Sequence, residues 1–239
     1  MAPDSREALP ELLKWQFGHP AIQRAAIRAV TRFGEAAVPD LVKALPNSVA
    51  LYALPRMGPA ARDAIPHLIK HLEPGRKEVP PEVIHALGLF GPDARDAVPP
   101  LLKLLALNDS YSKRRYTELV VAALGAIGPD AGEAIPTLAA MLRNPPEDRE
   151  PVAYGRNTEM PPFRFKLAAA LARLDPKNTD SVVVLNEYLE KVPPFVGLRA
   201  SAELVRLRPE DRERARRLAG WLCGKYLLFV DERPSSTAQ

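Results

Sequence analysis

Two histidines, His67 and His71, have the spacing that most resembles a metal site. They are four residues apart, so on a helix they would share one face, as paired zinc ligands often do. Glu73 is close in sequence and His85 occurs in a later segment, but no third ligand stands at a fixed spacing. Cys223 is the only cysteine, which excludes an intrachain disulfide and a cysteine-based metal cluster. The sequence therefore predicts two solvated histidines and a chain that needs neither metal nor cofactor.

A second pattern is a lysine that returns four residues after each of four successive prolines. Its members are Lys14, Lys43, Lys70 and Lys103. Apolar residues stand one before and two, three and six after the proline, as at Pro66 and Pro99, so the helical period places the lysines away from the core. We expect a row of positive charge, the lysine ladder, that contacts a partner. Glu11 and Asp40 would partly neutralise it, and lysine is also a good surface helix former, so a purely structural origin stays open.

The elements that carry these lysines belong to a repeated motif. Gly58–Pro66 (GPAARDAIP) returns as Gly91–Pro99 (GPDARDAVP) and as Gly128–Pro136 (GPDAGEAIP), and Gly34–Pro39 is a shortened copy. Self-similarity at a period of a few tens of residues is typical of solenoids. Each unit predicts a helix A, a Gly-Pro turn and a helix B that begins at the second proline. One helix kinked at that proline is the alternative, and we favour the separate turn.

Degenerate copies extend the array over most of the chain. Helix B is expected to begin at Pro10, without a helix A before it, and then at Pro39, Pro66, Pro99, Pro136, Val183 and Arg216. We therefore predict one domain over residues 1–230, with an irregular loop at 144–162 and a disordered tail at 231–239. The apolar stretch Leu119–Ile127 is too short to span a bilayer. No signal peptide is visible at the N-terminus, so we expect a cytoplasmic protein without a membrane contact.

The motif resembles bacterial HEAT repeats of the phycobilisome-lyase-related kind. The resemblance is strongest in Val83–Leu105 and Val120–Leu142 and good in Tyr52–Leu72. It implies an all-α fold, an α-solenoid of about six HEAT-type repeats plus an N-terminal half repeat, with helices B lining a concave face. HEAT-type di-iron hydroxylases carry His-Glu pairs, which this sequence lacks. A HEAT-type lyase or glycosylase-like enzyme remains an alternative, because such enzymes have no short signature to test.

Composition agrees with a binding role without naming the partner. The chain is 46% hydrophobic but only 6% aromatic, which suits an aliphatic core of closely approaching helices. Its net charge of +4 is mild for a dedicated nucleic-acid binder. Acidic residues interleave the basic run Arg206–Arg217, which indicates a solvated helix. We expect a non-catalytic scaffold that binds a protein through the helix-B face, and a weak nucleic-acid or acidic-partner binder using the lysine ladder as the alternative.

The loop at 144–162 yields a first testable prediction. It breaks the repeat spacing, and long irregular connections are often functional. Tyr154 and Arg156 are residue types enriched in interfaces, so we expect both to contact the partner. Replacing the loop by a few Gly and Ser residues should change the melting temperature little and lower partner affinity several-fold. The full-length double variant Tyr154→Ala/Arg156→Ala is the control for side chains alone, and full affinity of the shortened protein would make the loop a neutral insertion.

Overall fold

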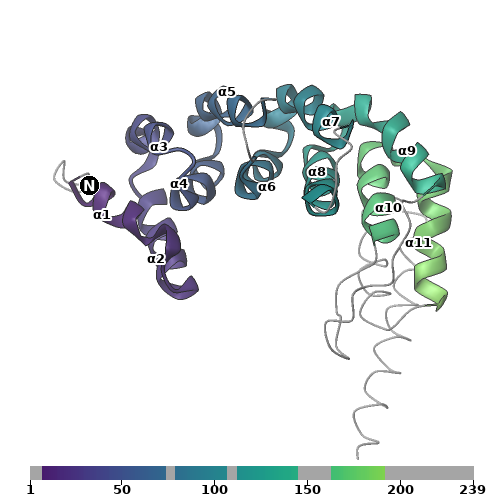
Figure 1. Cartoon of the computed structure of the whole chain (residues 1–239), viewed down its shortest axis with the longest axis horizontal. Coiled ribbons are helices and arrows are strands. Elements are labelled where there is room, and N and C mark those ends of the chain that lie inside the picture. Colours follow the sequence, from purple (N-terminus) through teal and green to yellow (C-terminus); the bar gives the residue numbers. More distant parts are fainter. Residues whose placement is uncertain (1–6, 74–78, 107–111, 145–162, 192–239) are drawn as a thin grey trace, which may run out of the picture. The chain divides into compact units, whose positions relative to one another are not determined.

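The structure is a computed structural model that describes residues 7–73, 79–106, 112–144 and 163–191. All regular secondary structure in these ranges is helical, without a strand, which confirms the all-α prediction (Figure 1). The described residues fall into two compact units that meet in sequence at Ala134 and Ile135. The expectation of one continuous domain over 1–230 stays a prediction, and the helix B expected from Arg216 and the tail expected at 231–239 lie outside the described residues.

The first unit contains eight α-helices in its described part: α1 (Leu9–Leu13), α2 (Pro20–Thr31), α3 (Val38–Lys43), α4 (Ser48–Ala53), α5 (Ile65–Ile69), α6 (Pro81–Phe90), α7 (Val98–Ala106) and α8 (Ser112–Ile127). Short 3₁₀ segments connect them: η2 (Lys14–Phe17), η3 (Gly34–Ala37), η4 (Leu54–Ala64), η5 (Lys70–Leu72), η6 (Gly91–Ala97) and η7 (Gly128–Ala134). The described helices of the second unit are α9 (Ile135–Arg143), α10 (Phe163–Leu174) and α11 (Thr179–Lys191).

Each copy of the motif opens on a glycine with positive φ. The values are 65° at Gly34, 67° at Gly58, 60° at Gly91 and 79° at Gly128. Only glycine adopts this backbone at little cost, so the prediction that these are turn residues is confirmed. At Gly58 and Gly91 the ψ angles are −142° and −135°, so the backbone there is extended and not left-handed helical.

The turns end where helix B begins. The helices α3, α5, α7 and α9 all start one residue before the second proline of the motif, and α1 starts in the same way before Pro10. A proline in the first turn of a helix loses no hydrogen bond, since that N–H has no partner within the helix. The chain changes from 3₁₀ to α-helix beside this proline, as the favoured separate turn predicts, but the two segments join directly, with helical backbone angles at Ala37 and Ala64.

Hydrogen bonds attach the N-terminal half repeat to the helices after it. The Asn47 side chain caps α4 by accepting from the Val49 N–H at 2.9 Å, and its amide donates to the Leu13 carbonyl at 2.9 Å. The Ser48 hydroxyl and the Gln23 amide both donate to the Gln16 carbonyl, at 3.0 and 2.9 Å. Carbonyls at the ends of α1 and η2, which have no helical partner of their own, are satisfied in this way.

The core of the first unit lies between two rows of helices (Figure 1). Helices α2, α4, α6 and α8 form the helix-A row and pack in succession, while α3, α5 and α7 form the helix-B row. Helix B buries the residue just before its second proline and the one two positions after it, as in Ile65 and Leu68 or Val98 and Leu101. The third expected core position is only half-buried, as at Leu102.

Small residues set the distance between α6 and α8. A Cβ added to Gly88 would stand 3.0 Å from the Cα of Ala123 and 3.3 Å from its Cβ. Ala86 and Ala123 are themselves buried. Close approach of these two helices therefore depends on the absence of a side chain at position 88.

In the second unit, α10 packs against both α9 and α11. No glycine stands in the turn between α10 and α11; instead Asn178 Oδ1 accepts from the Ser181 N–H at 2.9 Å, and the Ser181 hydroxyl donates to the Asn178 carbonyl. Ser181 is fully buried, so this cap satisfies a polar group that water cannot reach. The helix pair expected here from a degenerate repeat is present, but its second helix begins at Thr179 and not at Val183, because the Asn178 cap and not a proline sets its start.

The two glycines of η7 separate backbone strain from packing. Gly128 has φ +79° and Gly132 has no such constraint, and an added Cβ would meet nothing within 4 Å at either position. Gly128→Ala should lower the free energy of unfolding by about 1–2 kcal/mol, because an L-residue resists positive φ. Gly132→Ala should be neutral or stabilise by up to about 1 kcal/mol through the unfolded state. Urea melts of the two variants test this, and equal midpoints would contradict it.

Candidate functional site

All four residues of the lysine ladder are exposed, as predicted. Lys14 caps the end of α1, Lys43 ends α3, Lys70 opens η5, and Lys103 lies within α7. They stand at the same register of successive helices B. The corresponding later positions differ: Ala140 is exposed on α9, and Glu187, on α11, pairs with Arg164 at 2.9 Å.

Half of the lysine ladder is neutralised by acidic residues of its own helices. Lys14 Nζ lies 2.5 Å from Glu11 Oε1, and Lys43 Nζ lies 3.4 Å from Asp40 Oδ1. These are exposed pairs one turn apart, of the kind that stabilises a protein by well under 1 kcal/mol. Lys70 and Lys103 have no ion pair with any described residue. The available positive charge of this surface is therefore concentrated at α5–η5 and α7.

The helix-A row presents a second surface that the sequence interpretation did not identify. Counting back from each positive-φ glycine, the positions two and six residues earlier point outward in all four copies. The first position is occupied by Arg32, Arg56, Leu89 and Ala126, and the second by Arg28, Tyr52, His85 and Ala122. Tyr52 is half-buried and the other seven are exposed. We call this surface the helix-A face.

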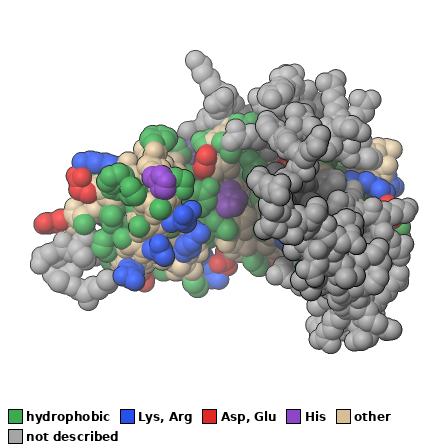
Figure 2. Space-filling model, turned by 90° about the horizontal axis from the view of Figure 1, so that it is seen from below, with side chains coloured by type: hydrophobic (Ala, Val, Ile, Leu, Met, Phe, Trp, Pro, Cys, Tyr) green, Lys and Arg blue, Asp and Glu red, His purple; other side chains and the backbone are tan. Residues whose placement is uncertain are grey.

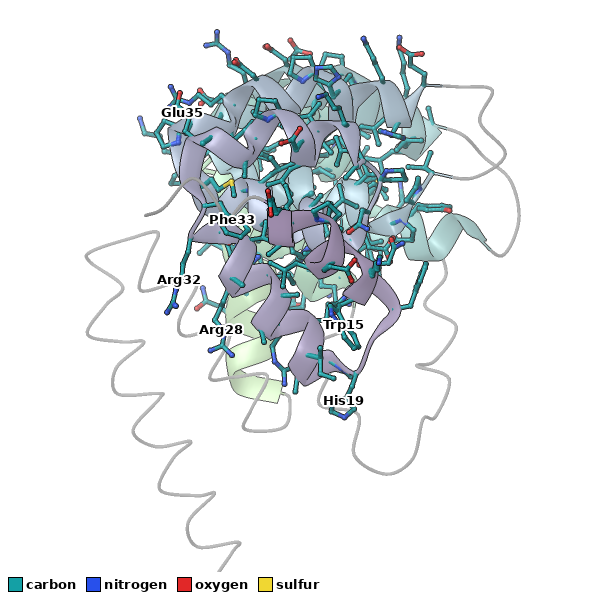
Figure 3. All side chains as sticks on the ribbon, turned by 90° about the vertical axis from the view of Figure 1, so that its left-hand side faces the viewer. Trp15, His19, Arg28, Arg32, Phe33 and Glu35 are labelled. Carbon is teal, nitrogen blue, oxygen red and sulfur yellow. The ribbon has the colours of Figure 1, made fainter. Side chains whose placement is uncertain are left out.

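Its most charged part is an arginine stripe on and just after α2. Arg24, Arg28 and Arg32 recur every four residues, all three are exposed, and residues 20–32 contain no acidic residue. None of the three forms an ion pair with the described part of the chain. Figure 3 shows Arg28 and Arg32 leaving α2 on one side, while Trp15 and His19 lie toward its other side. The spacing was a readable signal in the sequence, since charges at i, i+4 and i+8 share one helix face.

The helix-A face continues through Tyr52 of α4, Arg56 of η4 and His85 of α6. The rings of Tyr52 and His85 have centroids 5.4 Å apart and are tilted by 60°. The Arg56 guanidinium donates to the Tyr52 carbonyl oxygen. Burial raises the pKa of the Tyr52 phenol, the Glu82 carboxylate adds to this rise, and Arg56 opposes it. The Tyr52 hydroxyl is therefore neutral at physiological pH, and the positive charge here belongs to Arg56.

Seen from the side of the helix-A row, Lys and Arg side chains gather over one part of the described surface, next to histidine and hydrophobic side chains (Figure 2).

The turns between the two rows carry mixed charge instead. Arg62 of η4 and Asp93 of η6 form an ion pair at 2.7 Å that links successive turns. The Asp93 carboxylate holds the pKa of Arg62 above its ordinary value through a hydrogen bond and through its charge. This pair is satisfied within the protein and offers no site.

No group of three or more His, Cys, Asp or Glu residues capable of holding a metal ion occurs in the described ranges. His67 is exposed on α5, and His71 is half-buried and already makes an interaction of its own. Tyr154, Arg156 and the basic run 206–217 lie outside the described residues. The described part of the chain therefore offers two charged surfaces and no set of groups suited to metal chemistry.

One helical run, Tyr116–Arg143, is long and apolar enough to cross a membrane by length and composition alone. The core helices of globular proteins pass the same test, and half of its most apolar window is buried. The turn at Gly128 and Pro129 also divides this run into separate helices. It does not indicate a membrane.

Neither a protein-family model nor a curated protein matches this sequence. Among solved structures, the crystal structure of an engineered protein is similar over 94% of this chain and 93% of its own, with 21% sequence identity and a TM-score of 0.43. At that TM-score and identity the likeness carries no argument about function. The lysine ladder and the helix-A face are therefore the features from which a function can be inferred.

Proposed function

We propose that the chain is a HEAT-type α-solenoid that serves as a non-catalytic scaffold for a protein partner. One observation carries this proposal: the motif sets the same backbone at four successive turns, with a positive-φ glycine, a 3₁₀ segment and a helix that starts before a proline. Because the register is the same in each copy, equivalent outward positions recur at fixed intervals along two exposed surfaces, the lysine ladder and the helix-A face. Such extended, regularly spaced surfaces are what repeat proteins use to bind other macromolecules.

The lysine ladder lies on the helix-B surface, and it keeps the same residue type in four successive repeats. Lys70 and Lys103 favour an acidic partner, because both are exposed and unpaired within the described structure. That helices B line a concave face, and that the protein is cytoplasmic, stay predictions. Binding to a nucleic-acid backbone is the second candidate, supported by the same free lysines and the net charge of +4.

Affinity capture with the full chain, followed by mass spectrometry and by titration of the captured protein, tests the scaffold function. We expect a specific protein that binds the purified chain with a defined stoichiometry and without turnover. A nucleic acid as the main ligand would instead show a logarithmic affinity that falls linearly with the logarithm of salt concentration. That result would replace the protein scaffold by the second candidate.

The lysine ladder can be tested by charge reversal. Changing Lys14, Lys43, Lys70 and Lys103 to Glu should leave helical circular dichroism unchanged, since all four side chains face solvent. The stability cost should be under about 1 kcal/mol, from the two exposed pairs that are lost. Affinity for an acidic partner should fall by at least about tenfold, because rim charges steer and hold a complementary surface.

The matched control is Lys14→Glu/Lys43→Glu alone, which reverses the two lysines that already have acidic neighbours. This variant should lower the affinity for the partner less than Lys70→Glu/Lys103→Glu does. Binding of the quadruple variant with wild-type affinity would show that the lysines recur between repeats only as surface filler.

A further inference from the structure

The helix-A face changes character along the first unit. Its outward positions are arginines on α2 and η4, an aromatic pair where α4 meets α6, and apolar residues on α6 and α8. Leu89 is 44% exposed there, which is unusual among the leucines of this structure. Consecutive helices of the row pack against each other, so these side chains form one continuous surface.

The basic end has a regular geometry. Four residues of α-helix rise about 6 Å, so Arg24, Arg28 and Arg32 stand about 6 Å apart along the axis. Arg56 occupies the register of Arg32 on the neighbouring segment, and packed helix axes are about 8–10 Å apart. Three arginines therefore follow one another on α2 and at its C-cap, and the fourth, Arg56, stands at the equivalent position of the neighbouring η4.

Stability of α2 does not account for this arrangement. Like charges one turn apart destabilise a helix, and α2 has no acidic residue that would offset them. The described structure pairs Lys14 and Lys43 with acids of their own helices, but it pairs none of the three stripe arginines. Arginine also differs from lysine in that its planar fork can hold a carboxylate by two parallel hydrogen bonds. The stripe is therefore available to a ligand with spaced negative charges.

The apolar end decides which kind of ligand fits. A nucleic-acid strand requires positive charge along its whole path, whereas among the described side chains at the outward positions of this face the positive charge stops at Arg56, with Leu89, Ala122 and Ala126 beyond it. An amphipathic helix meets both ends, because it can place carboxylates one turn apart against the arginines and apolar side chains against Leu89 and the alanines. The graded surface thus favours a protein segment over a nucleic acid.

We propose that the helix-A face, with Arg24, Arg28, Arg32 and Arg56 at one end and Leu89 at the other, binds an acidic amphipathic helical segment of a partner protein. This rests on the proposed scaffold function and names the chemistry of its partner. It also places the contact on the row of helices opposite to that of the lysine ladder.

The test uses the full chain and a fluorescently labelled synthetic peptide of about 18 residues, long enough to form a helix. Glutamates occupy every fourth position of one end, and leucines occupy the same face of the other end. Anisotropy titrations compare wild type with Arg28→Glu/Arg32→Glu and with the matched control Arg143→Glu/Lys177→Glu, which makes the same charge change at two exposed positions of the second unit that belong to neither proposed binding surface. Reversal at position 28 places opposite charges one turn from Arg24, so the arginine variant should fold, and circular dichroism checks this.

We expect the arginine variant to lose at least about tenfold in affinity and the control variant Arg143→Glu/Lys177→Glu to change by less than about twofold. A peptide with Gln in place of every Glu should bind at least about tenfold more weakly, and Leu89→Glu should weaken the wild-type interaction. Four outcomes would each overturn the proposal. They are an equal loss of affinity in both double variants, equal affinity for the Gln and Glu peptides, no binding of the Glu peptide, and tighter binding of a labelled single-stranded oligonucleotide. If wild type and Arg28→Glu/Arg32→Glu capture a partner equally well, binding at the helix-A face is wrong but the scaffold function stands. If wild type captures no partner, the scaffold function itself is wrong.

Discussion

The positive φ of the four turn glycines is the constraint on which the rest of the described structure depends. A residue with positive φ lies outside the right-handed helical region, so the helix ends there. Glycine occupies the position because other L-residues would be strained in this backbone conformation. The proline that comes after three of these glycines cannot donate a backbone hydrogen bond, and the chain tightens into a 3₁₀ segment. The second proline then fits the first turn of the next helix. Glycine and proline together therefore fix where each helix ends and the next begins.

Because these boundaries recur, the outward positions of each helix recur as well. Residues two and six before the glycine face solvent in the helix-A row, and the residue four after the second proline faces solvent in the helix-B row. The buried positions are filled by leucine, isoleucine, valine, alanine and a few phenylalanines, and Ser181 is the one buried polar residue among those the structure describes. The outward positions are not constrained by packing, and the residues that occupy them differ mainly in charge. Arginines are concentrated at the first helix-A positions, while lysines recur through the helix-B positions.

Packing between helices imposes a second, local constraint. The approach of α6 to α8 at Gly88 and Ala123 is so close that a single Cβ would require movement. Ion pairs contribute little by comparison: Arg62–Asp93 and Arg164–Glu187 lie at or near the surface, where such pairs are weak. The fold is therefore held by aliphatic burial and small-residue contacts, and surface charge is available for recognition.

The sequence by itself determined the all-helical class, the turn glycines, the starts of the five helices B that are marked by a proline, and the exposure of Lys14, Lys43, Lys70 and Lys103. It could do so because these features depend on local backbone chemistry and on the helical period, which a repeated motif displays several times. Tertiary structure alone decided which charges are available. Glu11 and Asp40 pair with two of the lysines, whereas Arg24, Arg28 and Arg32 find no acid within reach in the described structure. Only the stacking of α2, α4, α6 and α8 brings these arginines onto one surface with Arg56 and Leu89, because contacts between successive repeats depend on packing and not on the motif.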